Sequence, residues 1–157
     1  MPEPTIGTPI AGFRMKLYRA PIAASDVWVE VGGVQSASVD DVAREEIEVA
    51  LRGSEWKRII PGQMEAMGAT FKQVHNVVPG MEALIRNDVM NGTPAKYALV
   101  NGDITTTGTE GWVFPAYTTQ MNRSEENSEV VANDIKTKLG YIVNGSELVE
   151  PEWLTVA

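Results

Sequence analysis

The sequence contains no cysteine and a single histidine, and these shortages exclude several kinds of site. Without cysteine there is no disulfide framework, and thiol redox chemistry is not indicated. His75 has neither a cysteine nor a second histidine as a partner, so a zinc site of the usual kind is excluded. The 157 residues are enough for one domain that buries its own core without a disulfide or a metal.

Basic charge and long apolar runs are also scarce. Thirteen Lys and Arg stand against 21 Asp and Glu, and the formal net charge is −8. A protein that grips duplex DNA through its phosphates needs a dense basic surface, whereas this acidity repels nucleic acid at close range. No run of about eighteen apolar residues occurs, so we expect no membrane partner. Residues 1–12 lack the features of a secretory signal, and we expect synthesis in the cytoplasm.

Motifs for catalysis are missing as well. The sequence has no G-x-S-x-G, no P-loop and no G-x-G-x-x-G. His75 has no identifiable nucleophile beside it, which favours a structural histidine over a general base. Glu45, Glu46 and Glu48 could bind a hard cation or act as acid and base, but successive strand residues point to opposite sides and favour a solvated sheet face. We therefore expect no enzyme, no cofactor and no metal site.

What the sequence does contain is a series of segments that alternate apolar and polar residues, as β-strands do. In residues 45–51 the alternation places Ile47, Val49 and Leu51 inward and Glu46 and Glu48 outward. Pro115 lies inside one predicted strand, which indicates an edge or a bulge there. We expect strands within residues 13–20, 26–31, 34–39, 45–51, 64–75, 95–100, 111–121 and 130–143.

One helix is expected at residues 80–91, because Met81, Leu84, Ile85 and Val89 form a single apolar stripe. Pro79 lies near its start, and Gly92 marks its end. The fold class is mainly β, an antiparallel sandwich or small barrel with one flanking helix. We expect a flexible N-terminal arm at residues 1–12, a β domain at 13–143 and a C-terminal arm at 144–157.

The four tryptophans fall into two groups. Trp28 and Trp112 lie in predicted strands, where packing against the core is expected. Trp56 lies in a polar, basic loop predicted at residues 52–62, and Trp153 lies in the C-terminal tail. Trp is enriched at interface hot spots, so Trp56 either contacts a partner or folds back onto its own sheet, and both alternatives stay open.

The order of several motifs resembles the major tail tube proteins of long-tailed (siphovirus-type) bacteriophages. These motifs are VGGVQSAS, EEIEV, WKRIIPG and FPAY, and the resemblance spans roughly residues 10–142. Two segments depart from it. The stretch NGDITTTGTEG is longer than the expected tight hairpin, and the chain after residue 143 has no counterpart.

The resemblance implies two packed antiparallel sheets with a flanking helix, in six copies per ring, with rings stacked into a tube that conducts DNA. It implies that residues 52–62 reach the next ring. The candidate contacts are Arg52, Glu55, Trp56, Lys57 and Arg58 in that loop and Trp153 in the C-terminal arm, and Glu46 and Glu48 are candidates for an acidic lumen.

The same resemblance implies a location in the virion tail and a set of partners. The partners are further copies of the chain, the tape measure protein, the tail terminator and the baseplate or distal tail proteins, while genomic DNA passes through without being held. Two other functions stay open. One is the inner tube of a contractile injection or gene-transfer particle, and the other is a β-sandwich binding module with exposed aromatics as its ligand platform.

Overall fold

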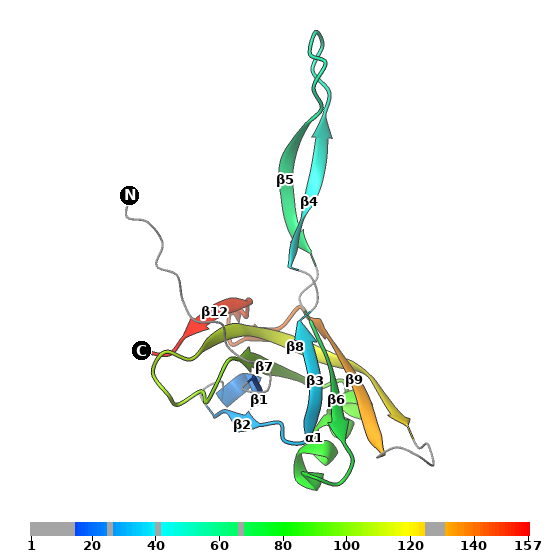
Figure 1. The fold of residues 1–157 in the computed structure, drawn as a ribbon, viewed down its shortest axis with the longest axis vertical. Coiled ribbons are helices and arrows are strands. Elements are labelled where there is room, and N and C mark those ends of the chain that lie inside the picture. Colours follow the sequence, from blue (N-terminus) through cyan, green and yellow to red (C-terminus); the bar gives the residue numbers. More distant parts are fainter. Residues whose placement is uncertain (1–14, 25–26, 40–41, 66–67, 125–130) are drawn as a thin grey trace.

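The computed structural model describes residues 15–24, 27–39, 42–65, 68–124 and 131–157, so the predicted arm at residues 1–12 lies outside the described residues. A rounded body carries one long hairpin, β4–β5, that projects away from it (Figure 1). The elements are β1 (Lys16–Pro21), the short 3-10 helix η2 (Ile22–Ala24), β2 (Val29–Glu30), β3 (Val34–Val39), β4 (Ala43–Val49), β5 (Arg58–Glu65), β6 (Ala69–Val74), α1 (Pro79–Asn91), β7 (Pro94–Val100), β8 (Glu110–Ser124), β9 (Ala132–Leu139), β10 (Val143–Asn144), β11 (Glu147–Leu148) and β12 (Glu152–Thr155).

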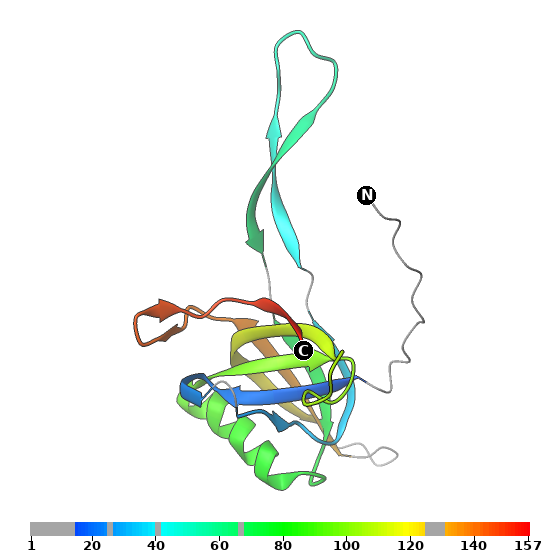
Figure 2. The same cartoon turned by 90° about the vertical axis from the view of Figure 1, so that its left-hand side faces the viewer.

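The body is a small barrel made from one curled antiparallel sheet. Within the described chain this sheet has eight strands in the order β2-β1-β7-β8-β9-β6-β3, with β12 paired to the first part of β8. The short connection from β2 to β3 hydrogen-bonds to β1 and β6, the second strand from each end of that order. The Val31 N–H donates to the Leu17 carbonyl in β1, and the Gly33 carbonyl accepts from the Val74 N–H in β6. The expected mainly β fold is confirmed: the sheet curls around a core, and residues 31–33 join its two outermost strands, β2 and β3 (Figure 2).

Large side chains from four neighbouring strands of the sheet fill the core. Phe71 from β6, Tyr97 from β7, Phe114 from β8 and Ile135 from β9 are each at most 2% exposed. The Tyr97 ring lies 6.2 Å from Phe71 and 6.4 Å from Phe114, measured between ring centroids. Close packing of this kind is the main source of stability in a domain of this size, since burying such a side chain contributes about 1.5–3 kcal/mol.

The strand expected within residues 13–20 is found as β1, and it is buried on both faces, although alternating apolar and polar residues are typical of a strand with only one buried face. Leu17 points into the barrel core, while Tyr18 belongs to a second cluster on the outer face. That second cluster also contains Ala98, Val100 and Val113, and Trp28, Ile104 and Leu154 pack against it. The alternation of β1 marks its two faces correctly, but the cover on the outer face comes from segments far away in sequence.

Pro115 lies within β8, where the neighbour on one side changes. Pairing with β12 ends at Val113, and pairing with β9 begins at Ala116. A residue without an N–H therefore stands where one hydrogen-bonded ladder is interrupted, as expected for proline in a sheet. A bulge follows between Thr118 and Gln120.

The helix α1 lies against the barrel, one residue longer at its start than expected (Figure 2). Gly92 ends it in the left-handed conformation, at φ 65°, a region that favours glycine. Met81 and Ile85 are buried, but Leu84 of the predicted stripe is 45% exposed. The buried face instead includes two acids, Glu82 and Asp88.

Both buried acids of α1 bond to the barrel. Asp88 receives two hydrogen bonds from the Arg19 guanidinium, at 3.0 and 2.9 Å. Burial raises the pKa of Asp88, and the Arg19 charge opposes that rise. Glu82 accepts from the Asn76 N–H and the Asn133 amide and lies 2.7 Å from His75 Nδ1. Burial alone would raise the pKa of Glu82, but these hydrogen bonds outweigh it and lower that pKa.

Two predicted segments are divided differently in the structure. The strand expected at residues 64–75 is two strands, because β5 ends at Glu65 and β6 begins at Ala69. The predicted C-terminal arm contains the small pair β10–β11 and then β12, which is part of the barrel sheet. Residues 152–155 of the predicted arm therefore form a strand of the main sheet, which the sequence did not indicate.

Candidate assembly surface

The hairpin β4–β5 is a two-stranded ribbon whose strands pair only with each other among the described residues. Ile47 stands opposite Ile60, Glu48 opposite Ile59 and Val49 opposite Arg58. Because residues paired in an antiparallel ladder share a face, Ile47, Val49 and Ile60 lie on one face and Glu46, Glu48 and Ile59 on the other. The alternation predicted for residues 45–51 is present in the register.

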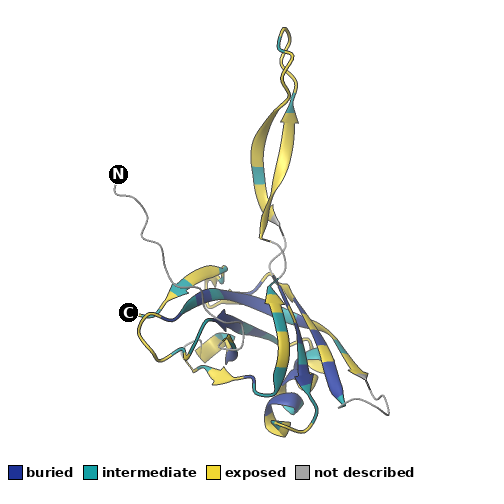
Figure 3. Ribbon diagram, in the orientation of Figure 1, coloured by how far each residue is buried: buried dark blue, intermediate teal, exposed yellow. Residues whose placement is uncertain are grey.

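The prediction that one face of this strand points into a core is wrong, because the described chain covers neither face of the hairpin. Ile47 and Leu51, which we expected to point inward, are 46% and 52% exposed. Figure 3 shows nearly the whole hairpin as exposed, in contrast to the dark strands of the barrel. An isolated two-stranded ribbon is at best marginally stable in water. The hairpin therefore presents apolar side chains that the described chain does not cover.

The loop predicted at residues 52–62 is shorter, because β5 begins at Arg58. Pro61 is tolerated in the strand since each strand of a two-stranded ribbon has one unpaired edge. The register shifts between Arg44 and Glu46, and a Cβ on Gly62 would stand 3.0 Å from the Glu45 Cβ, so glycine fits this crowded bulge. The hairpin tip is therefore residues 50–57.

Of the five predicted contact residues, four lie in the tip, and Arg58 is the first residue of β5. Trp56 is 78% exposed, so it does not fold back onto its own sheet. Its backbone N–H donates to the Ser54 hydroxyl at 3.3 Å, and the Ser54 N–H donates to the Leu51 carbonyl at 3.2 Å. These two bonds order the backbone of the turn, and the exposed indole is open to a partner.

Exposed apolar side chains run along the hairpin from tip to base. Apolar side chains exposed together on one projecting element favour an interaction surface. They lie on both faces and are between 46% and 78% exposed: Ile47, Leu51, Trp56, Ile59, Ile60 and Met64.

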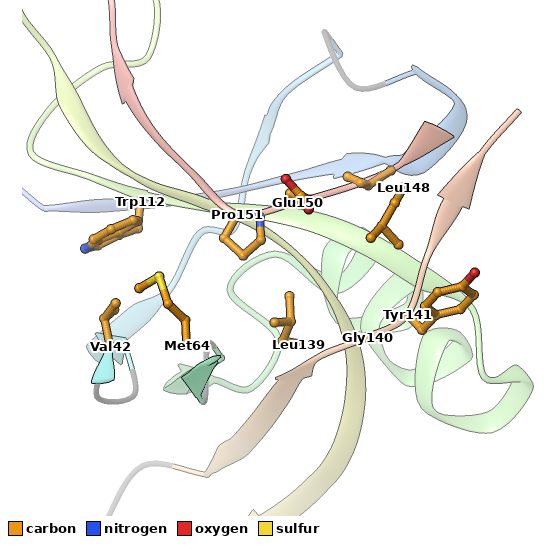
Figure 4. Close-up of a pocket in the computed structure, with 10 residues that line it drawn as sticks. Val42, Met64, Trp112, Leu139, Gly140, Tyr141, Leu148, Glu150 and Pro151 are labelled. Carbon is orange, nitrogen blue, oxygen red and sulfur yellow. The ribbon is translucent and has the colours of Figure 1, made fainter. Parts of the chain in front are cut away.

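A pocket of about 450 Å³ lies where the hairpin joins the barrel, and we name it the root pocket (Figure 4). Val42 and Met64 come from the hairpin base, and Trp112 comes from β8. The other lining residues come from the end of β9 and from the C-terminal segment: Leu139, Gly140, Tyr141, Leu148, Val149, Glu150 and Pro151. The sequence did not predict this pocket, and its one signal was the chain after residue 143, which has no counterpart in the resemblance.

Trp153 was predicted as a contact of a C-terminal arm. In the structure it lies in β12 opposite Trp112, and the two rings meet edge to face with centroids 5.2 Å apart. Trp153 is still 52% exposed. Trp28 and Trp112 pack against the two core clusters, as expected.

Within the described residues, His, Cys, Asp and Glu do not gather into a group of three that could hold a metal ion. The described part of the chain also contains no helix with the length and apolarity that a membrane crossing needs.

No protein-family model matches the sequence, and no curated protein matches it. The solved structures that resemble the chain over nearly its whole length include three assemblies with a tail or a tube. The SPP1 tail tube aligns with a TM-score of 0.68 at 16% identity, covering 94% of this chain and 80% of that one. The tail of an empty GTA particle with C6 symmetry aligns with a TM-score of 0.70 at 10% identity, covering 95% and 100%. The PVC sheath–tube complex in the extended state aligns with a TM-score of 0.64 at 16% identity, covering 94% and 93%. The chain therefore has the fold of these tail and tube proteins.

Proposed function

We propose that this chain is a structural virion protein that polymerises as stacked rings into a tail tube, an acid-lined conduit for DNA. The observation that carries the proposal is the hairpin β4–β5, which exposes apolar side chains on both faces and pairs with no other described strand. Burying apolar surface contributes about 25 cal/mol per Å². Copies of the chain that covered each other's hairpins would gain this free energy.

Rings of six copies agree with the C6 symmetry of the GTA tail, which shares the fold. Each ring would use a head-to-tail interface that closes by rotation, and the hairpins would join one ring to the next. The tape measure protein, tail terminator and baseplate or distal tail proteins would then meet the tube inside or at its two ends. The mature protein would reside in the virion tail after synthesis in the host cytoplasm.

Electron microscopy of the concentrated protein tests this function. We expect uniform hollow rods, because the same contacts repeat from ring to ring, and a monomer at low concentration on size-exclusion chromatography. A protein that stays monomeric at every concentration and in virions would overturn the proposal. It would favour the binding module instead, with the root pocket of about 450 Å³ as its ligand site.

The contents of the particle distinguish a phage tail tube from the inner tube of a different particle. Because GTA and PVC structures share the fold, the inner tube of a gene-transfer or contractile injection particle is the second candidate. Purifying native particles and identifying their contents and any surrounding sheath decides between a phage tail and these alternatives.

Glu46 and Glu48 lie on one face of the hairpin and are both exposed, which keeps them as candidates for the lumen. Acidic side chains there would repel DNA phosphates over about one Debye length, roughly 8 Å at physiological salt. We expect Glu46→Lys with Glu48→Lys to leave tubes intact and to slow DNA delivery about tenfold or more, most strongly at low salt.

The control for this prediction changes the net charge equally at other exposed acids. Glu30→Lys with Asp134→Lys replaces two exposed carboxylates on the barrel. Delivery kinetics are followed in particles carrying each pair of substitutions at two salt concentrations. Equal slowing by both pairs, or none by Glu46→Lys with Glu48→Lys, would argue against a lumen position for these residues.

A further inference from the structure

The root pocket is an unfilled apolar surface in the single chain. Met64, Leu139, Tyr141 and Leu148 are between 43% and 82% exposed, although all four line the same cavity. The labelled side chains in Figure 4 surround the cavity from several elements, with Leu139 and Pro151 on its floor and roof. A cavity of about 450 Å³ is of the size that proteins use to hold a compact apolar group, roughly 300–1,000 Å³.

The rim of the root pocket is acidic. Glu150 lines the pocket itself, and Glu147 and Glu152 join it in lining the adjoining hollow over Lys96. An occupant that inserts an apolar group while presenting positive charge would complement this surface. Such complementarity selects the partner and its orientation.

The hairpin tip has this combination of properties. Trp56 and Leu51 are the exposed apolar side chains of the tip. The tip also carries Arg52 and Lys57, Arg58 follows it at the start of β5, and Glu55 is its single acid. Trp and Arg are the residue types most enriched at interface hot spots. The tip of one copy is therefore complementary to the root pocket of another in both apolarity and charge.

The length of the hairpin allows the same contact to recur between successive copies. At about 3.3 Å per residue, the seven residues of β4 span about 20 Å, and the tip extends the hairpin to about 30 Å. A second copy displaced along the hairpin by that length has its own root pocket beside the first copy's tip. The contact joins two different surfaces, so it continues from copy to copy without closing on itself.

We propose that the root pocket receives the hairpin tip of a second copy of this chain, with Trp56 in the cavity and Arg52 and Lys57 beside Glu147 and Glu150. This inference rests on the proposed function, because it names the receiving surface for the hairpin of a stacked tube. The length of the hairpin then sets the distance between successive rings.

Site-directed crosslinking tests the pairing directly, since the chain has no native cysteine. Glu55→Cys places a thiol beside Trp56 without removing it, and Tyr141→Cys places one in the pocket wall. We expect a short bismaleimide to convert assembled Glu55→Cys/Tyr141→Cys protein into a ladder of covalent multimers. Either single variant should give no ladder beyond a dimer. The control pair is Glu55→Cys with Met90→Cys, because Met90 is 78% exposed on α1 and lies outside the pocket.

Exchanging the charges of the two surfaces gives a second test. If these residues only supported the fold of their own chain, reversing the second set of charges would not restore assembly. We expect Arg52→Glu with Lys57→Glu to raise the critical concentration for rods about tenfold or more, and Glu147→Lys with Glu150→Lys in the same chain to restore most of that loss. Rods that form with no specific 55–141 ladder and no rescue would overturn the pocket assignment but leave the tube intact. Absence of rods from the wild-type chain would overturn the proposed function itself.

Discussion

Shortening the hairpin is expected to abolish tube assembly while leaving the barrel folded. In this variant an Asn-Gly turn replaces residues 47–60 and joins Glu46 to Pro61, which already face each other across the ladder. None of the removed residues belongs to either core cluster, so the thermal midpoint should change by only a few degrees. Loss of two or more interface hot spots, each about 2 kcal/mol, should raise the critical concentration at least about 1,000-fold.

Negative-stain microscopy across a concentration series, with circular dichroism of the same samples, measures both parts of this prediction. Trp56→Ala should reproduce much of the loss, because the indole is the largest exposed group of the tip. Met90→Ala removes a side chain of equal 78% exposure from α1 and should leave rods unchanged. Normal rods from the shortened chain would show that the hairpin is not the assembly element.

The local elements of this fold could be predicted well from the sequence. The helix at residues 80–91 follows from its proline, its glycine and its apolar stripe, and it is found at Pro79–Asn91. Period-two alternation located most strands, because side chains alternate between faces whatever lies beyond them. The tail-tube fold expected from the order of motifs is confirmed by the structural comparisons.

Alternation alone does not say what covers each face, and the errors come from this limit. Ile47 was expected to point inward but lies on a ribbon that the described chain does not cover, whereas Tyr18, on the outer face of β1, is buried. In β1 the second cover comes from segments up to Leu154, at the far end of the chain. These contacts join residues distant in sequence, so a pattern read within one segment cannot contain them.

The candidate site also has one part that the sequence could identify and one part that it could not. Trp56 could be identified because a large aromatic in a polar loop has no local reason to be buried. The root pocket could not, since its walls come from the hairpin base, β8, the end of β9 and the C-terminal segment. A pocket formed by four separate segments exists only after they have been brought together by the strand pairing of β8 with β9 and β12.

The ion pair between Arg19 and Asp88 is expected to be the most sensitive single contact in the barrel. The two side chains are 9% and 5% exposed and lie 2.8 Å apart at their closest atoms. Asp88→Ala would leave the Arg19 guanidinium buried without a counter-charge, which typically destabilises by about 3–5 kcal/mol. For a domain of this size, about 1 kcal/mol shifts the thermal midpoint by about 2–4 °C, so we expect a fall of about 6–20 °C in thermal unfolding.

The double variant Arg19→Met/Asp88→Leu separates the loss of a partner from the loss of packing. It removes both charges and keeps apolar volume between β1 and α1, so its stability should lie within about 1–2 kcal/mol of the wild type. Asp103→Ala removes an exposed carboxylate that accepts its hydrogen bonds from Thr105 in the same turn, so it should cost far less than Asp88→Ala. If Asp88→Ala proved as mild as Asp103→Ala, water would be reaching Arg19, and α1 would not seal the barrel. Because the hairpin lies apart from α1, destabilised Asp88→Ala protein should still form rods below its unfolding temperature, which makes stability and assembly separable properties of this chain.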